Sequence, residues 1–286
     1  MKSLFCTFSL IFFFACVLNA QDYIPKPDDI KHFPQTKTMI VLEDNPMCEY
    51  NLTIKEHVPN EWKTTSFDFI EWKDFEANRK NDNLSFLLLN KVKFEKDKTN
   101  AQYQFMSLLI GGSAKNLSSM PDMCSIPLAY YGAAEDSYLY KVDIFLRFMQ
   151  NHVKTLMDNP KIASKNVVAY YNSNVQKLNG KTLYLIAGEL GKDVNTEAKI
   201  KKVYAGPVKI VTKEEIEKAI SDKDPSVVFL HKVGPGKKNL ANARCYKVLV
   251  GADDALFYYF DYHKISDKAP DCFMASDFKK LAKNNR

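Results

Sequence analysis

The residues that could carry chemistry in this chain of 286 residues do not fall into a known catalytic spacing. None of the five histidines belongs to a His-Glu-x-x-His motif or another paired spacing of metal ligands. The run Gly234-Pro235-Gly236-Lys237-Lys238 is not a phosphate-binding loop, because Lys238 stands where Ser or Thr must follow the lysine. Ser113 lacks the Gly-x-Ser-x-Gly elbow of a serine nucleophile. The sequence therefore predicts no catalytic residue, no metal ligand and no cofactor-binding residue.

His231 stands out among the histidines because it lies near the end of the apolar run 226–233. Ligand sites of open α/β sheets often lie beyond the ends of such strands. Two interpretations remain open, a ligand-binding residue and a structural histidine that is hydrogen-bonded at the sheet edge.

The first twenty residues have the layout of a secretory signal peptide. A basic Lys2 precedes an apolar run, and Ala20 supplies the small residue before the expected cleavage site. A rival cleavage before Cys16 would produce a lipid-anchored protein, but Phe13 stands where a leucine is usual. We therefore expect an exported protein, periplasmic or secreted, that has no transmembrane segment.

Four cysteines remain after this cleavage, and no pair has the Cys-x-x-Cys spacing of redox or zinc sites. An even number in an oxidising compartment permits two disulfides. We predict pairing within each half of the chain, which keeps each half independently closed. The alternative is four buried free thiols. The predicted pairs are Cys48–Cys124 and Cys245–Cys272.

The two halves of the mature chain resemble each other. Residues 67–92 align without a gap to residues 208–233, at an offset of 141. Residues 37–42 resemble 181–186, and Pro121-Asp122-Met123-Cys124 resembles Pro270-Asp271-Cys272. The apolar positions agree and the order is kept, which indicates an internal duplication. The alternative is that two generic strand–helix–strand patterns agree by chance.

Each half reads as strand–helix–strand–helix–strand followed by antiparallel strands, which predicts an α/β fold of two tandem units. Thr212 and Glu215 form a capping box that begins a helix, and residues 244–250 and 256–262 form a hairpin. We expect the first unit to pass from residues 103–110 to Cys124 without its last hairpin strand. The expected boundaries are 1–20 for the signal peptide, 21–36 for an N-terminal arm, 37–160 for the first unit with a long closing helix, and 161–286 for the second unit.

Two apolar segments are candidates for a partner surface. The expected long helix, 137–158, carries apolar residues at alternating spacings of 3 and 4, including Leu139, Leu146 and Val153. The strand 256–262 places aromatic side chains on both faces, among them Phe257 and Tyr259. A protein partner could cover these residues, and the alternative is that they pack within the chain itself.

The second unit resembles a bacterial envelope domain, the α/β domain of the TolB amino-terminal region and of the curli-secretion and flagellar-assembly lipoproteins. The resemblance rests on the opening strand 181–186, the segment 208–216, the apolar strand 226–233 and the hairpin 246–262. It implies a scaffold or partner-binding module, and it brings no catalytic residue. The tandem copies and the Pro-Asp-Cys element depart from that family's pattern.

The formal net charge is +6, and the basic residues are mixed with acidic ones, which does not favour nucleic-acid binding. We therefore expect an exported, non-catalytic envelope protein that binds a protein partner and needs no cofactor. Two alternatives remain, a binder of a soluble ligand in the cleft between the units and an enzyme whose site is assembled from distant residues. A clear pocket between the units would favour the first alternative, and a cluster of perturbed acids, bases or histidines in one cleft would favour the second.

Overall fold

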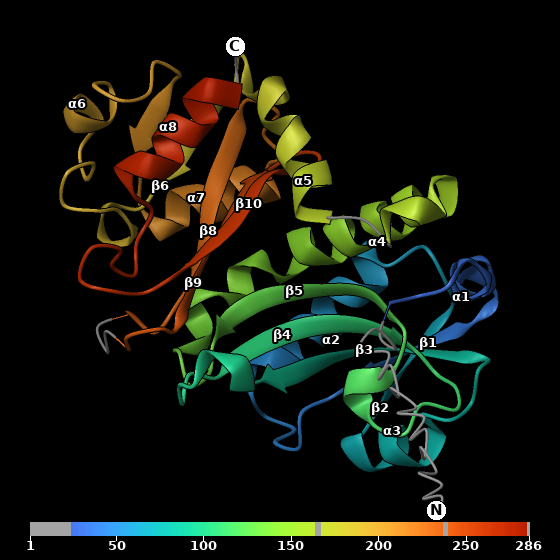
Figure 1. Ribbon diagram of the computed structural model, residues 1–286. Coiled ribbons are helices and arrows are strands. Elements are labelled where there is room, and N and C mark those ends of the chain that lie inside the picture. The colour runs from blue at the N-terminus through green and yellow to red at the C-terminus, as the bar shows by residue number, and fades with distance from the viewer. Residues whose placement is uncertain (1–23, 164–166, 237–239, 285–286) are drawn as a thin grey trace, which may run out of the picture.

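The computed structural model describes residues 24–163, 167–236 and 240–284, and the predicted signal peptide and Cys16 lie outside this part of the chain. The described chain folds into two α/β units, each built on a five-stranded sheet (Figure 1). The first sheet contains β1 (Lys37–Val41), β2 (Phe67–Ile70), β3 (Leu84–Val92), β4 (Tyr103–Ile110) and β5 (Asp122–Tyr130). The second contains β6 (Thr182–Leu185), β7 (Val208–Ile210), β8 (Val227–Val233), β9 (Arg244–Gly251) and β10 (Phe257–Lys264).

Both sheets have the same strand order, which confirms the predicted α/β class and is consistent with the duplication. The first runs β2-β1-β3-β4-β5 and the second, read from its other end, β7-β6-β8-β9-β10. In each sheet the first three strands pair in parallel, and the last two pairings, β3–β4 and β4–β5 or β8–β9 and β9–β10, are antiparallel.

The offset of 141 holds for part of the repeat. Strands β2 and β7, which begin at Phe67 and Val208, keep it, and so do the starts of β4 and β9, Tyr103 and Arg244. The pairs Phe86↔Leu109 and Phe229↔Val250, in contrast, place β3 on β8 at an offset of 143. Helix α7 (Lys213–Ser221, 9 residues) is two residues longer than its counterpart α3 (Trp72–Asn78, 7 residues). Because side chains alternate along a strand, a shift of two residues keeps every side chain on the same face.

Helix α4 (Val142–Asp158) lies between the two units (Figure 1). It covers the same face of the first sheet as α2 (Glu49–Glu61), while α3 covers the opposite face. The second unit presents its α7 face to α4, with Val227 and Phe229 of β8 in the shared core. Its outer face packs on η7 (Ser173–Leu178), α6 (Glu197–Ile200) and α8 (Ala275–Asn284), with Val228 and Leu230 in a second core.

Smaller elements complete the chain. Helix α1 (Pro27–His32) and the 3-10 turn η1 (Phe33–Gln35) occupy the predicted N-terminal arm, and α5 (Val167–Asn172) follows α4. Residues before α4 form the 3-10 turns η4 (Glu135–Ser137) and η5 (Leu139–Lys141), so the expected long helix begins later than predicted. Short 3-10 turns also occur at η2 (Glu95–Asp97), η3 (Leu117–Ser119), η6 (Pro160–Ile162) and η8 (Ala187–Glu189).

The predicted partner surface is wrong, because all of its residues are buried within the chain. Helix α4 is covered by both sheets, and the two faces of β10 are covered by α4 and by the outer core of the second unit. The alternative, packing within the chain, is what the structure shows. The buried residues are Leu139 (5% exposed), Leu146 (0%), Val153 (0%), Phe257 (4%) and Tyr259 (2%).

The prediction that the first unit lacks its last hairpin strand is also wrong. Strand β5 pairs antiparallel with β4 and contains Cys124, whereas Cys272 lies beyond β10. The two Pro-Asp-Cys elements therefore occupy different places in their units. The repeat does not extend to them.

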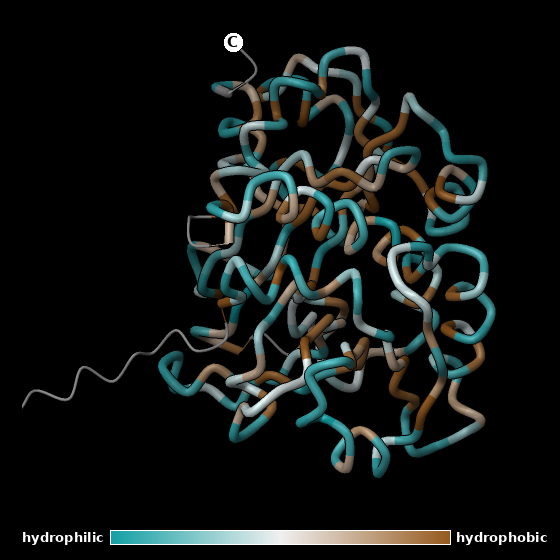
Figure 2. Tube along the Cα trace, turned by 90° about the vertical axis from the view of Figure 1, so that its right-hand side faces the viewer, coloured by the Kyte–Doolittle hydropathy of each residue, from teal (hydrophilic) through white to brown (hydrophobic). Residues whose placement is uncertain are grey.

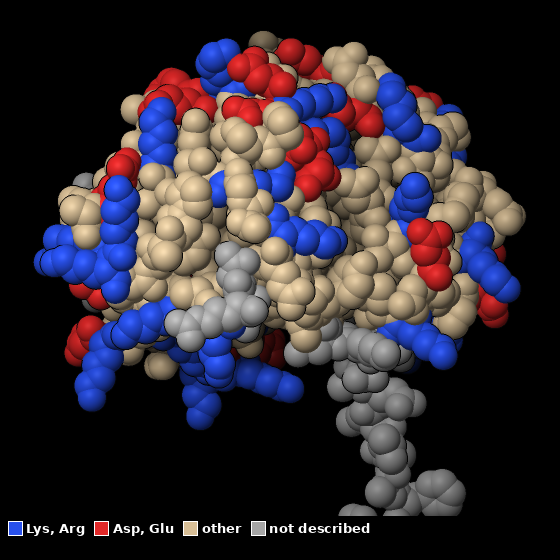
Figure 3. Space-filling view, turned by 90° about the horizontal axis from the view of Figure 1, so that it is seen from above, with Lys and Arg blue, Asp and Glu red and all other residues tan. Residues whose placement is uncertain are grey.

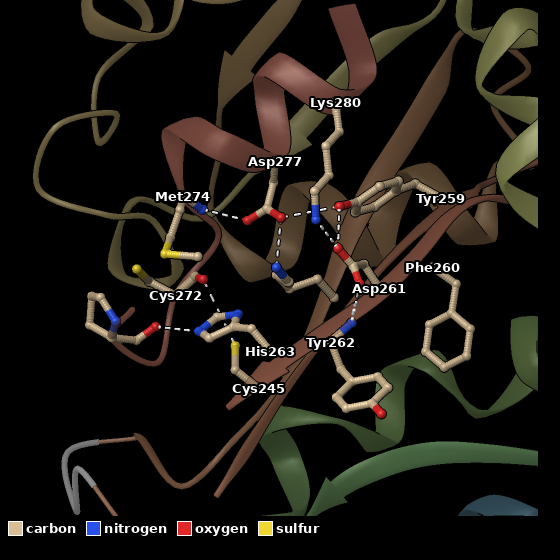
Figure 4. Close-up of polar contacts among 12 residues, drawn as sticks. Cys245, Tyr259, Phe260, Asp261, Tyr262, His263, Cys272, Met274, Asp277 and Lys280 are labelled. Atoms are coloured by element: carbon tan, nitrogen blue, oxygen red, sulfur yellow. Dashed lines mark hydrogen bonds and ion pairs between the residues drawn. The ribbon is translucent and has the colours of Figure 1, made fainter. Parts of the chain in front are cut away.

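The structure contains free thiols in place of the predicted disulfides Cys48–Cys124 and Cys245–Cys272. Cys124, Cys245 and Cys272 are buried, and the Cys245 thiol lies 3.8 Å from the carbonyl oxygen of Cys272 (Figure 4). The alternative of free thiols that pack as small apolar side chains fits this arrangement.

The distribution of hydropathy and charge agrees with two sheets around shared cores. Hydrophobic segments lie mainly inside (Figure 2), and acidic and basic side chains lie among one another over the face seen from above (Figure 3). No helix in the described part of the chain is long and apolar enough to cross a bilayer.

Candidate functional site

A cavity of about 240 Å³ lies where the two units meet. The first unit contributes β5 and α4, and the second contributes α5 and β10. Apolar and aromatic side chains from both units form its walls, with a few polar groups among them. The wall residues include Asp122, Met123, Cys124, Ser125, Phe148, His152, Leu156, Tyr171 and Phe257.

The walls follow from the periodicity of their elements. Phe148, His152 and Leu156 are spaced by four residues and so share one face of α4. The rings of Phe148 and Phe257 stack across the two units with centroids 3.5 Å apart and an interplanar angle of 9°. Tyr171 lies against both, with centroid distances of 5.3 and 5.7 Å. One wall of the cavity is therefore an aromatic cluster that joins the units.

Asp122 is the polar group without a full set of partners. Its Oδ1 atom is inaccessible to solvent and has no hydrogen-bond partner among the described residues. Burial raises the pKa of this carboxyl to about 6, while hydrogen bonds from the Ser125 side chain and the Cys124 backbone oppose the shift. The carboxyl is therefore ionised above about pH 6, and an ionised buried carboxylate needs a cationic or hydrogen-bonding partner.

His152 and Tyr171 form a neutral pair. The ring Nδ1 of His152 and the hydroxyl of Tyr171 are hydrogen-bonded. Burial lowers the pKa of His152 to about 4, so the ring is uncharged at neutral pH. Burial also raises the pKa of Tyr171, which stays protonated. A neutral imidazole with its proton on Nε2 accepts at Nδ1, so the Tyr171 hydroxyl can donate to it.

Cys124 lines the cavity as a thiol and not as a thiolate. Burial and the neighbouring Asp122 carboxylate raise the pKa of Cys124 well above its usual value. A reactive cysteine has a lowered pKa, so this residue is not an activated nucleophile. Among the described residues no three His, Cys, Asp or Glu side chains gather into a group that could hold a metal ion. The Cys124 side chain therefore contributes to the wall as a neutral, weakly polar group.

Sequence reasoning found only part of this site. Phe257 and Cys124 were singled out for other roles, as a partner surface and as half of a disulfide, and both line the cavity. Asp122 was noted only as part of a repeated element. His152 could have been noticed as a histidine on an apolar helix face. His231 lies at a different junction between the units, described below.

Comparison of the chain with protein-family models, with curated proteins and with solved structures gives no match. The geometry and chemistry of the cavity therefore carry the functional inference.

Proposed function

We propose that the protein binds a small, mainly apolar amine in the cavity between its two units. The observation that carries this proposal is the Asp122 carboxyl, whose unpartnered oxygen is buried beside aromatic walls. Asp122 is the only Asp, Glu, Lys or Arg among the described residues that line the cavity. A protonated amine would pair with it, and aromatic rings nearby favour a cation further.

The size of the cavity limits the ligand. An apolar cavity of about 150 Å³ accommodates benzene. The cavity of about 240 Å³ therefore leaves room for one ring and a short chain that ends in the amine. Binding sites for small molecules commonly combine such apolar walls with a few polar groups that fix orientation.

Phenethylamine is a suitable probe, with ethylbenzene, 2-phenylethanol and phenylacetate as matched compounds. At pH 7.5 we expect calorimetry to give the tightest binding for the amine, weaker binding for the alcohol and the hydrocarbon, and none for the acid. Asp122→Asn should weaken amine binding by at least about tenfold. Asp68→Asn, which removes an exposed carboxylate 61% accessible in its side chain, serves as the control.

Two results would count against the proposal. One is equal binding of the amine and phenylacetate, and the other is unchanged amine binding in Asp122→Asn. Either would mean that the carboxyl of Asp122 does not select the ligand.

Export remains part of the proposal and rests on the sequence of residues 1–20. A binder of this kind in the periplasm or outside the cell would meet small solutes, and a scaffold role in the envelope would require a surface other than the buried residues discussed above. N-terminal sequencing of the exported protein should begin at Gln21. A start at lipid-modified Cys16 would instead indicate a membrane-anchored protein.

A further inference from the structure

A second, smaller cavity of about 150 Å³ also lies between the units. It is bounded by β5 and η5 of the first unit and by η8 and β8 of the second. Its polar side chains include Lys141, Glu189 and His231. These groups are far apart in the sequence, and only the packing of one unit on the other brings them together.

The ammonium group of Lys141 is buried without a carboxylate partner. The residue is 3% exposed, and no described carboxylate oxygen lies within 4.0 Å of its Nζ atom. Its hydrogen-bond partner is Nδ1 of His231 at 3.4 Å. The Nε2 atom of His231 donates to the carbonyl oxygen of Pro127 at 2.8 Å, so Nδ1 is the acceptor of a neutral ring. The positive charge on Lys141 is therefore not neutralised by this contact.

Glu189 provides the complementary group. Its Oε2 atom is inaccessible to solvent and has no hydrogen-bond partner in the described chain. The neighbouring Lys232 is already committed to Asp271, with Nζ and Oδ1 2.8 Å apart and both side chains largely buried. Among the described residues that line this cavity, Lys141 and Glu189 thus each lack an oppositely charged partner, and they are too far apart to form an ion pair with each other.

We infer that this cavity is a second ligand site, for a small carboxylic acid that carries a hydroxyl or amino group next to its carboxylate. The ligand's carboxylate would pair with Lys141, and its hydroxyl or amino group would donate to Glu189. A plain carboxylate would leave Glu189 without a partner, and a plain amine would leave Lys141 without one. The volume suits an acid of two or three carbon atoms.

The pKa shifts of Glu189 and Lys141 are consistent with a ligand that bridges the two groups. Burial raises the pKa of Glu189, although Lys141 and Lys232 act against the shift. Burial lowers the pKa of Lys141, and Glu189 acts against that shift. A ligand that bridges the two groups would favour the charged form of Lys141 and supply the donor that Glu189 lacks.

Four probes test the inference by calorimetry at constant pH and ionic strength. Glycolate and glycine contain both groups, whereas acetate and ethanolamine each lack one. We expect at least one of the first two to bind at least about tenfold more tightly than acetate and ethanolamine. Lys141→Met and Glu189→Gln should each remove this binding. Lys213→Met is the matched control, because Lys213 approaches the same Tyr140 ring (5.8 Å, against 4.7 Å for Lys141) but does not line the cavity.

Folding of the variants should not confuse the result, because Lys141→Met replaces an unpaired buried charge with an apolar side chain of similar length. Three outcomes would overturn the inference. Acetate could bind as tightly as glycolate and glycine, binding could persist in Lys141→Met, or no probe could bind up to roughly 10 mM. The last outcome would mean that the cavity holds water only.

Discussion

Replacing Asp122 by Asn removes a buried charge while keeping the shape of the side chain. The pKa of this carboxyl is about 6 in the folded protein, against an ordinary value of 3.8. A difference of about 2 pKa units corresponds to about 3 kcal/mol. The residue as a whole is partly exposed, so water can relax around the charge and reduce its cost. We therefore expect the ionised carboxyl to lower the free energy of unfolding by about 2 kcal/mol.

The direction in which the free energy of unfolding changes with pH follows from the protons that each state binds. Between pH 3.8 and about 6 the folded protein holds a proton on Asp122 that the unfolded chain has lost. The free energy of unfolding therefore falls as the pH rises through this window, and the full cost is present above pH 6. Asn carries no charge, so the variant is free of this cost.

The contribution of His152 to stability changes with pH in the opposite direction, and it must be separated from that of Asp122. Its pKa is lowered from 6.5 to about 4, so between these values the unfolded chain binds more protons than the folded protein. Its contribution to stability therefore rises with pH over this window. The two effects partly cancel in the wild type, but His152 is present in both proteins. The difference between wild type and Asp122→Asn isolates the carboxyl.

Urea denaturation, followed by the fluorescence of Trp62 and Trp72, measures this difference at pH 4 and pH 8. Relative to wild type, the variant should gain about 2 kcal/mol of unfolding free energy between the two pH values. Asp68→Asn should show no such gain, because hydrogen bonding to Lys37 lowers the pKa of Asp68. A stability difference that is constant from pH 4 to pH 8 would refute the assignment of Asp122 as a buried carboxyl with a raised pKa.

Three further substitutions or measurements test the structure. Asp277→Asn breaks the buried pair with Lys247 (2.6 Å) and should lower the free energy of unfolding by about 3–5 kcal/mol, whereas Lys280→Met at the half-exposed neighbouring pair should change it little. Arg147→Met removes the bonds from α4 to the carbonyl oxygens before β10 (2.8 and 3.2 Å) and should cost about 2–3 kcal/mol by the same denaturation assay. The four cysteines in the described chain should all react with a thiol reagent after denaturation without reductant, and two disulfides found by peptide mapping would contradict the structure.

The α/β class and most of the succession of strands and helices along the chain could be predicted from the sequence because apolar alternation and capping signals are local. The capping box of Thr212 and Glu215 forms as predicted at the start of α7. Strand β5 was missed because Pro127 interrupts its pattern. A proline is tolerated there because β5 is the edge strand of its sheet.

The ligand cavities could not be predicted, because they depend on how one unit packs on the other. Asp122 and Phe257 line one cavity although 134 residues separate them in a sequence that contains no signal for the contact. The apolar seam of α4 was recognised, but its spacing does not say whether the helix faces a partner or a second sheet of the same chain. In the structure the helix packs against the second sheet of the same chain.

Methionine methyl NMR tests the central claim, that the cavity between the units binds a small apolar amine. Among the nine methionines, Met123 lines this cavity and Met47 is 74% exposed, which provides an internal control. Titration of protein labelled at the methionine methyl groups with phenethylamine should shift the Met123 resonance, assigned with Met123→Leu, to saturation. The Met47 resonance should stay in place, and the Met123 shift should be lost in Asp122→Asn. A saturable shift elsewhere with Met123 unchanged, or no shift at all, would contradict the account.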